Sequence, residues 1–297
     1  MKWKKWSGVL LAALCLVGCS SETVEQEKPE YAVGVVLKAI NSPYWLDLKS
    51  GMENAAENYG IDLTLTYPSG EREDEEQNDL IDDMLHRDID ALLVAPCNSY
   101  DTQWFMNRAK QKNIITLAVD TKALDVDLPY IGTDNQQVGL LASEYFTQEL
   151  QNGSLLILGG QGNQSSNAER VQTIKDSMSD AFDITVRYTE LTEEEGYNAV
   201  MKLTKPVNGI FCTNSVVGLG AAAALKERGW TAKIIAVDTE DDAVQILDSG
   251  VMDAIICQNG YEIGYQAIEI IRQALEQDSQ PKDVLFDVKL TTQEGDT

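Results

Sequence analysis

The chain has 297 residues and a formal net charge of −25. This length allows two domains with sizeable cores. The strong acidity argues against nucleic acid and anionic lipid surfaces as partners, because both would be repelled, whereas it says nothing against a small neutral ligand.

The first residues have the pattern of an export signal. MKWKKW is basic, and GVLLAALCLVG is apolar but too short to span a bilayer comfortably. The apolar run ends in LVGC, which resembles the bacterial lipobox, whose cysteine is diacylated and becomes the mature N-terminus. We predict a lipoprotein signal peptide over residues 1–18, lipidation at Cys19 and a polar tether over residues 19–30. An ordinary secretory signal or a single membrane anchor is the alternative.

Lipidation of Cys19 predicts an extracytoplasmic protein whose only link to the membrane is its lipid anchor. The anchor favours the outer face of a Gram-positive membrane over a free periplasmic location. Three further cysteines, Cys97, Cys212 and Cys257, each follow an apolar run, so we interpret them as buried core residues.

Short β-rich runs alternate with amphipathic stretches along the rest of the chain. Repeated βαβ units of this kind predict parallel sheets with helices on both faces. The number of units is too large for one compact sheet, so we predict an α/β protein with two doubly wound, Rossmann-like domains. The predicted strands are residues 32–37, 61–67, 90–95, 114–119, 154–159, 184–189, 208–213, 233–238 and 252–257.

The helix predicted after the first strand opens with two aromatic residues, Tyr44 and Trp45. Trp45, Leu48 and Met52 are spaced as one helical face, and Gly60 suits the position after the helix end. As core residues the two rings would pack on the sheet. As ligand-binding residues they would cover the apolar face of a sugar ring.

Ligands of such sheets bind beyond the carboxyl ends of the strands. The residues at these positions are rich in side chains that bind hydroxyl groups, because carboxylates accept, arginine donates as a fork and amides do both. The candidate ligand-binding residues are Lys38, Asn41, Ser42, Tyr44, Trp45, Asp120, Thr121, Arg170, Asn214, Asp238 and Gln258.

Several patterns invite an enzyme interpretation, and each has a simpler one. Asp120 and Asp238 could form an acid/base pair, but they serve equally as ligand acceptors or helix N-caps. GGQGNQSS, residues 159–166, lacks the third glycine of a dinucleotide loop and is predicted to be a plain turn. His86 is the single histidine, which nearly excludes a metal cluster or a histidine-based triad. We predict no enzyme activity, no cofactor and no metal, and we interpret residues 70–77 as a solvated helix start.

Eight segments in chain order resemble the type I periplasmic binding proteins of the ribose and galactose kind, which serve ABC transporters. The segments are GVVLKAINSPYW, DALLVAP, ITLAVDT, IGTDN, NAER, IFCTN, IIAVD and IICQN. The resemblance extends from about Tyr31 to about Thr292. It implies two domains that are joined by three crossovers and close around a ligand by hinge motion. The implied N-terminal domain is 31–133 plus 259–287, and the implied C-terminal domain is 134–258 plus 288–297.

The resemblance also implies roles for individual residues. Tyr44 and Trp45 would stack on the sugar, Asp120 would accept its hydroxyls, and Asp134 would lie at the hinge. The residues that match the family's polar ligand contacts in the second domain are Arg170, Asn214, Asp238 and Gln258.

Three positions depart from the ribose binders. Thr121 stands where they carry arginine, Lys38 stands where they carry serine, and Leu191 lies near an expected aromatic residue. The sugar therefore stays open between ribose, another sugar, a polyol and a sugar-like signal molecule.

The sequence as a whole predicts a monomeric, lipid-anchored protein that captures a small sugar and delivers it to an ABC permease. One alternative keeps the fold but presents the ligand to a membrane receptor kinase or a chemoreceptor. Another is a soluble enzyme on a Rossmann-like scaffold.

Overall fold

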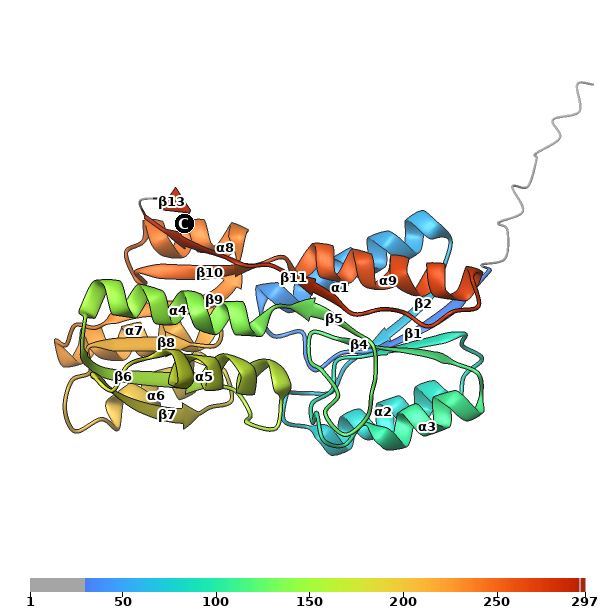
Figure 1. Ribbon diagram of the computed structural model, residues 1–297, viewed down its shortest axis with the longest axis horizontal. Coiled ribbons are helices and arrows are strands. Elements are labelled where there is room, and N and C mark those ends of the chain that lie inside the picture. Colours follow the sequence, from blue (N-terminus) through green and yellow to red (C-terminus); the bar gives the residue numbers. More distant parts are fainter. Residues whose placement is uncertain (1–29, 294, 297) are drawn as a thin grey trace, which may run out of the picture.

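A computed structural model of the chain describes residues 30–293 and 295–296. The predicted signal peptide, Cys19 and nearly all of the tether lie outside these residues. The described chain forms two lobes side by side, each built on its own sheet with helices on both faces (Figure 1). The prediction of two doubly wound α/β domains is confirmed.

The sheet of the first lobe is parallel throughout. Its spatial order is β11-β5-β4-β3-β1-β2. The strands are β1 (Ala32–Val36), β2 (Asp62–Thr66), β3 (Ala91–Val94), β4 (Ile115–Val119), β5 (Tyr130–Thr133) and β11 (Val284–Phe286).

The sheet of the second lobe is parallel except at one edge. Its order is β13-β12-β10-β9-β8-β6-β7, and β12 is antiparallel to both of its neighbours. The strands are β6 (Gly153–Gly159), β7 (Phe182–Tyr188), β8 (Gly209–Cys212), β9 (Lys233–Thr239), β10 (Ala254–Gln258), β12 (Lys289–Thr292) and β13 (Gly295–Asp296).

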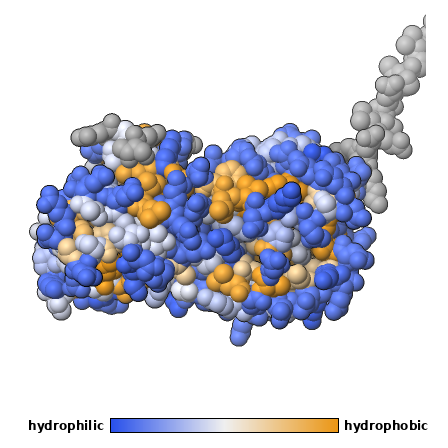
Figure 2. Space-filling model, viewed as in Figure 1, coloured by the Kyte–Doolittle hydropathy of each residue, from blue (hydrophilic) through white to orange (hydrophobic). Residues whose placement is uncertain are grey.

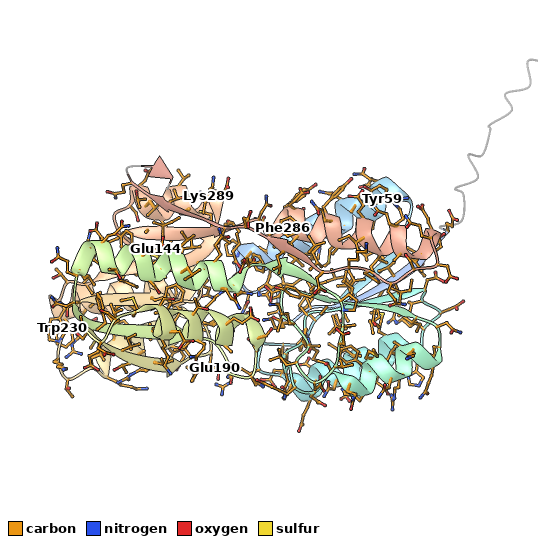
Figure 3. The ribbon with its side chains drawn as sticks, in the orientation of Figure 1. Tyr59, Glu144, Glu190, Trp230, Phe286 and Lys289 are labelled. Atoms are coloured by element: carbon orange, nitrogen blue, oxygen red, sulfur yellow. The ribbon has the colours of Figure 1, made fainter. Side chains whose placement is uncertain are left out.

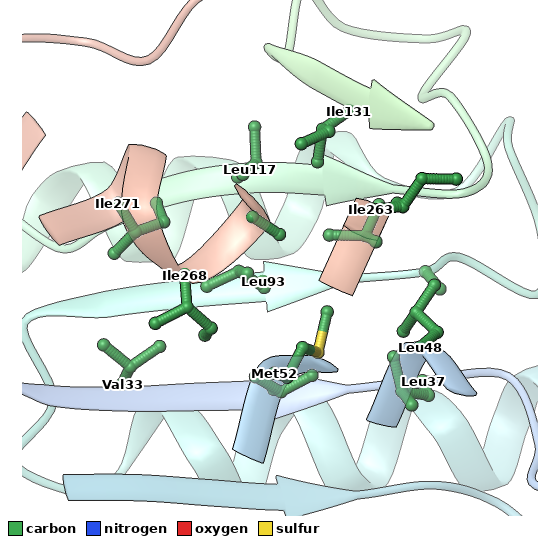
Figure 4. Close-up of a cluster of buried hydrophobic side chains, with 14 of the residues drawn as sticks. Val33, Leu37, Leu48, Met52, Leu93, Leu117, Ile131, Ile263, Ile268 and Ile271 are labelled. Atoms are coloured by element: carbon green, nitrogen blue, oxygen red, sulfur yellow. The ribbon is translucent and has the colours of Figure 1, made fainter. Parts of the chain in front are cut away.

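Helices cover both faces of each sheet, as the βαβ pattern predicted. In the first lobe, α1 (Pro43–Tyr59) and α9 (Gly260–Glu276) share one face, while α2 (Asp74–Leu85) and α3 (Gln103–Gln111) share the other. In the second lobe, α4 (Asn135–Leu150) and α5 (Ser165–Ser177) lie opposite α6 (Glu193–Met201), α7 (Ser215–Arg228) and α8 (Glu240–Asp248). Buried aliphatic side chains fill each layer, and Figure 4 shows the layer under α1 and α9.

The backbones of α1 and α9 are in contact at two glycines. A Cβ atom on Gly51 would lie 2.0 Å from the Tyr261 carbonyl oxygen, and one on Gly264 would lie 2.0 Å from the Leu48 carbonyl oxygen. Only glycine allows this approach. The contact fixes α1, and with it the two aromatic residues at its start, against a helix that begins directly after a crossing between the lobes.

The chain crosses between the two sheets three times. The crossings follow β5, β10 and β11, because each of these strands is succeeded by an element of the other lobe. At the first crossing, Asp134 caps α4 by accepting hydrogen bonds from the backbone of Gln136 and Gln137. Its own backbone N–H donates to the carbonyl of Phe286 (2.9 Å), which lies between the lobes at the third crossing (Figure 3). We retain the predicted domain boundaries and the hinge role of Asp134 as proposals.

Polar residues cover most of the visible surface of the molecule (Figure 2). The face in Figure 2 is mainly hydrophilic, with apolar residues in separate patches. Within residues 30–293 and 295–296, no helix combines the length and apolar character needed to cross a bilayer.

Candidate functional site

A small cavity lies between the two lobes, where the carboxyl ends of the strands in both sheets meet. Its volume is about 40 Å³. About 10–15 Å³ is enough for one water molecule, so the space holds a few waters. The lining residues are Lys38, Ser42, Tyr44, Trp45, Glu71, Asp120, Ser166, Asn167, Arg170, Leu191, Thr213, Asn214, Val237, Asp238 and Gln258.

The structure brings nine of the eleven candidate residues to this cavity. Thr121 is fully buried, but it lies behind the lining and binds Lys38 and Asp120. Asn41 is exposed and does not line the cavity, because it precedes the N-cap of α1 on the solvent side of the turn. Thr121 therefore supports the cavity wall, and Asn41 lies outside the lining of the cavity in this structure.

A buried ion pair forms the wall of the first lobe. The Lys38 ammonium lies 3.1 Å from Asp120 Oδ2 and donates to Thr121 Oγ1 at 2.8 Å. Thr121 Oγ1 in turn donates to Asp120 Oδ2 at 2.7 Å. Burial raises the pKa of the Asp120 carboxyl, but Lys38, Thr121, Arg170 and Tyr44 together outweigh it and hold that pKa below the usual value. Asp120 is therefore ionised at neutral pH.

The backbone of Asp120 also has an unusual conformation. Its φ angle is 62°, in the left-handed region that non-glycine residues seldom adopt, and Leu191 on the opposite wall has a φ of 56°. Residues held in this way are concentrated at binding and catalytic sites, where packing enforces the strain. Of the five described non-glycine residues with positive φ, these two line the cavity, which supports it as the candidate functional site.

The two aromatic residues at the start of α1 are both buried. Tyr44 and Trp45 pack edge to face, with ring centroids 5.3 Å apart and planes at 70°. The Lys38 ammonium lies 5.3 Å from the Trp45 ring centroid, within the range of a cation–π contact. Trp45 is also fixed at its edge, because Nε1 donates to Glu71 Oε1 at 3.0 Å.

In the wall of the first lobe, the hydroxyl of Tyr44 is buried but has no hydrogen-bond partner among the described residues. It does not meet the geometry of a hydrogen bond with any of them, although it lies near enough to the Asp120 carboxylate to help lower the pKa of that group. Burial and the Asp120 carboxylate raise the pKa of Tyr44 well above its usual value, so the hydroxyl stays protonated. An unpaired buried hydroxyl costs free energy, which a ligand oxygen in the cavity would recover.

Arg170 organises the wall of the second lobe. Its guanidinium donates to Asn135 Oδ1 (2.7 Å), to the carbonyl of Thr213 (2.9 Å) and to Gln258 Oε1 (2.6 Å). Gln258 Oε1 also accepts from Thr133 Oγ1 at 3.0 Å. Burial lowers the pKa of Arg170 while Asp120 opposes that shift, and the guanidinium remains charged.

Two further polar side chains lie at the carboxyl ends of strands in the second sheet, Asn214 after β8 and Asp238 near the end of β9. Asn214 caps α7 by accepting from the backbone of Val217 (3.0 Å), so its amide nitrogen is the group that it offers to the cavity. Asp238 is buried, and its Oδ1 accepts from the backbone N–H of Thr239 at 2.8 Å. Donors and acceptors are thus distributed around the whole cavity.

Sequence reasoning missed several lining residues. Glu71 falls in the stretch 70–77 that we interpreted as a solvated helix start. That interpretation is wrong at Glu71, whose side chain lines the cavity, and at Gln77, which is buried and donates to the carbonyls of Leu37 and Ala95. Ser166 ends the stretch 159–166 that we predicted to be a plain turn, Asn167 opens the NAER segment without a role assigned to it, and Thr213 and Val237 were not singled out. No pattern in the sequence marks Glu71, because it lies in the loop between β2 and α2.

Hydrogen bonds join the two lobes across the rim of the cavity. The backbone N–H of Ser99 donates to the carbonyl of Asn163 (2.9 Å), and that of Ser165 donates to Ser99 Oγ (2.9 Å). Lys122 forms an ion pair with Glu169 at 2.9 Å. The loop between β6 and α5, which resembled a dinucleotide loop, supplies several of these contacts. The structure therefore shows the closed arrangement of the lobes.

The described residues offer little for metal chemistry or thiol chemistry. Within them, no group of three or more metal-binding side chains comes together. His86 is exposed, and its Nδ1 lies 2.7 Å from the carbonyl of Asp82. Cys97, Cys212 and Cys257 are buried free thiols, which confirms their predicted place in the core.

The chain is similar in sequence to known proteins over most of its length. The family model of the periplasmic binding protein domain matches residues 33–279. The D-allose-binding periplasmic protein of Escherichia coli is 25% identical over 94% of this chain and 96% of its own length. The ribose import binding protein of Bacillus subtilis is 22% identical, over 95% of this chain and 96% of its own.

Solved structures show the same fold. A solute-binding protein from Burkholderia graminis in complex with D-arabinose superposes with a TM-score of 0.83 at 23% identity, covering 90% of this chain and 97% of its own. The myo-inositol-binding protein of Caulobacter gives a TM-score of 0.82 at 18% identity, covering 89% and 94%. At these identities the likeness establishes the fold.

Proposed function

This chain belongs to the periplasmic binding protein family of sugar-binding ABC-transport proteins, and we propose that it captures a small neutral sugar or polyol between its lobes and delivers it to an ABC permease. The names of its relatives describe binding and import, which supports delivery to a permease over presentation to a receptor. As in those relatives, the function is transport and not catalysis.

The observation that carries the proposal is the composition of the cavity lining. It combines two aromatic rings, Tyr44 and Trp45, with charged and amide groups on both walls. A sugar presents apolar C–H faces and a rim of hydroxyls that both donate and accept, so it matches such a lining. A wrong epimer would leave buried polar groups unpaired at a cost of about 1–3 kcal/mol each, which provides selectivity.

The size of the cavity requires a conformational step. Its volume of about 40 Å³ holds a few waters, whereas a monosaccharide has many more heavy atoms. We infer that the ligand enters when the lobes part at the three crossings and that the closed form with ligand is wider than the closed form described here. The rim contacts are mainly single hydrogen bonds, each contributing about 0.5–1.5 kcal/mol, so opening is energetically accessible.

The first experiment measures binding directly. We expect calorimetry with D-allose, D-ribose, D-arabinose, xylitol and myo-inositol to detect a saturable complex with at least one of them. These are compounds that similar proteins are named for or were solved with. A sugar acid of the same size is the control, since the acidic chain and the carboxylates of the lining disfavour an anion. Absence of binding to every member of a wider monosaccharide and polyol panel would refute the sugar proposal.

The proposed lipid anchor is tested separately at Cys19. In a bacterial host that processes lipoproteins, the wild-type chain should enter the detergent phase on Triton X-114 partitioning, because two acyl chains anchor stably. Cys19→Ala should stay in the aqueous phase, and Cys97→Ala is the matched control that should partition like wild type. Detergent partitioning of Cys19→Ala would show that another segment holds the protein to the membrane.

A further inference from the structure

A chain of hydrogen bonds runs along the cavity wall from one lobe to the other. Trp45 Nε1 donates to Glu71 Oε1 (3.0 Å), and the carbonyl of Glu71 accepts from Gln164 Nε2 (2.8 Å). Gln164 Oε1 accepts from Asn167 Nδ2 (2.8 Å), whose Oδ1 accepts from the backbone of Gly160 (3.3 Å). Glu71 and Asn167, one from each lobe, line the cavity.

This series of hydrogen bonds crosses from one lobe to the other at one bond, from Gln164 Nε2 to the carbonyl of Glu71. Gln164 is fully buried and belongs to the loop that precedes α5, while Glu71 lies in the loop between β2 and α2. The loop between β2 and α2 also meets the second lobe at an ion pair between Arg72 and Glu190, which lies in the connection from β7 to α6. When the lobes part, the link to Glu71 is broken, and the buried Nε2 donor of Gln164 loses its acceptor.

At its first-lobe end, this series of hydrogen bonds holds Trp45, an aromatic residue in the wall of the cavity. The indole of Trp45 is 4% exposed and is fixed at its edge by Glu71 of the same lobe, so loss of the Gln164 bond acts on Trp45 through the position of the Glu71 loop. We propose that Glu71 and Gln164 are positioning residues that complete the Trp45 wall only when the cleft is closed. This inference rests on the proposed function and adds to it the means by which closure sharpens the binding surface.

The physical consequence concerns the lifetime of the complex. A ligand that stacks on Trp45 stabilises the closed form, and the closed form in turn holds Trp45 in place, so the two effects reinforce each other. Loss of the link should leave association nearly unchanged and accelerate dissociation. Removing one partner of a buried hydrogen bond has a cost that corresponds to about tenfold to a hundredfold in affinity.

The first test replaces Gln164, using the compound that binds wild type best in the calorimetric panel. Gln164→Met keeps the length of the side chain but removes its donor and acceptor. Gln172→Met on α5 is the matched control, since Gln172 is exposed and bonds only to Asp176 among the residues described. We expect Gln164→Met to raise Kd about tenfold or more through a faster koff, while Gln172→Met matches wild type.

The second test reads the position of Trp45 itself. In a protein in which Trp45 is the only tryptophan, the others being replaced by phenylalanine, Glu71→Ala with saturating ligand should shift the emission to longer wavelength and increase quenching by acrylamide. Glu71→Gln retains an acceptor for Nε1 and should restore the wild-type emission. Glu73→Gln, at an exposed carboxylate of the same loop, is the control.

The outcomes separate this inference from the proposed function. If wild type binds no sugar or polyol, the proposed function fails. If wild type binds but Gln164→Met dissociates like Gln172→Met, or if Glu71→Ala leaves the emission of bound-state Trp45 unchanged, only the positioning role is overturned. The Glu71 variants keep the test decisive if Gln164→Met does not fold.

Discussion

Arg170→Met is expected to lower the affinity for the best ligand of the panel by at least about a hundredfold. The substitution removes a buried cation and three N–H donors in the lining. It removes the arginine donor from Asn135 Oδ1, from the carbonyl of Thr213 and from Gln258 Oε1. Gln258 then keeps the bond from Thr133 Oγ1 but loses the shorter of the two bonds that orient its amide. Calorimetry at matched protein concentrations measures the change.

The variants Arg170→Lys and Arg187→Met are the controls. Lysine keeps the positive charge of Arg170 but lacks its planar set of donors. If Arg170→Lys recovers part of the affinity, that part depends on the charge, and the affinity still lost depends on the geometry of the guanidinium. Arg187 lies on β7 away from the cavity, with one long bond of 3.4 Å to the carbonyl of Ala199, and its replacement should leave affinity unchanged. Normal binding by a cooperatively folded Arg170→Met would move the ligand site away from this cavity.

Most strands were predictable because their runs of β-branched and aliphatic residues are buried on both faces of a parallel sheet. The strands that escaped are those at or near the crossings. β5 follows a polar stretch, and we interpreted it as the switch between domains. β11 has three residues, and only Leu290 of β12 is buried, so neither shows the apolar run by which we recognised the other strands. These segments are strands because distant partners pair with them, and local sequence does not encode that pairing.

The site was predictable to the extent that it follows the strands. Asp120, Asp238 and Gln258 lie at strand ends, where the rule for parallel sheets places ligand contacts. Glu71 lies in the loop after β2, and Asn167 lies in the first turn of α5 after β6. Both stand several residues beyond the end of their strand, where the rule for strand ends does not single out one position.

Replacement of Lys38 is expected to have the largest effect on stability. Lys38 and Asp120 are 2% and 5% exposed, and their charged atoms lie 3.1 Å apart. Lys38→Met keeps much of the side-chain volume but leaves the Asp120 carboxylate buried without its ion-pair partner. Breaking a buried pair from one side costs about 3–5 kcal/mol, so we expect the free energy of unfolding to fall by that amount. Urea denaturation of the ligand-free protein at neutral pH measures it.

The pH dependence of the loss of stability in Lys38→Met identifies its cause better than the size of that loss does. In wild type the pKa of Asp120 is below its usual value, so its contribution to stability is fully present above the unfolded value and is lost as the pH falls through the lowered one. Without Lys38, burial becomes the larger influence and we expect that pKa to rise above the unfolded value. The folded variant then binds a proton that the unfolded chain does not hold, and acidification stabilises it. The difference in the free energy of unfolding between wild type and Lys38→Met, which we call the stability gap, should therefore decrease as the pH is lowered from about 7 to about 5.

Two comparisons identify the unpaired carboxylate as the cause. Lys49→Met removes a surface ion pair with Glu53 and should cost at most about 1 kcal/mol, with no pH-dependent gap. Lys38→Met combined with Asp120→Asn leaves no buried charge unpaired, so it should be more stable than Lys38→Met alone. If the double variant is the less stable of the two, or if the gap stays constant with pH, the cost arises from lost packing against Trp45 and not from the isolated charge of Asp120.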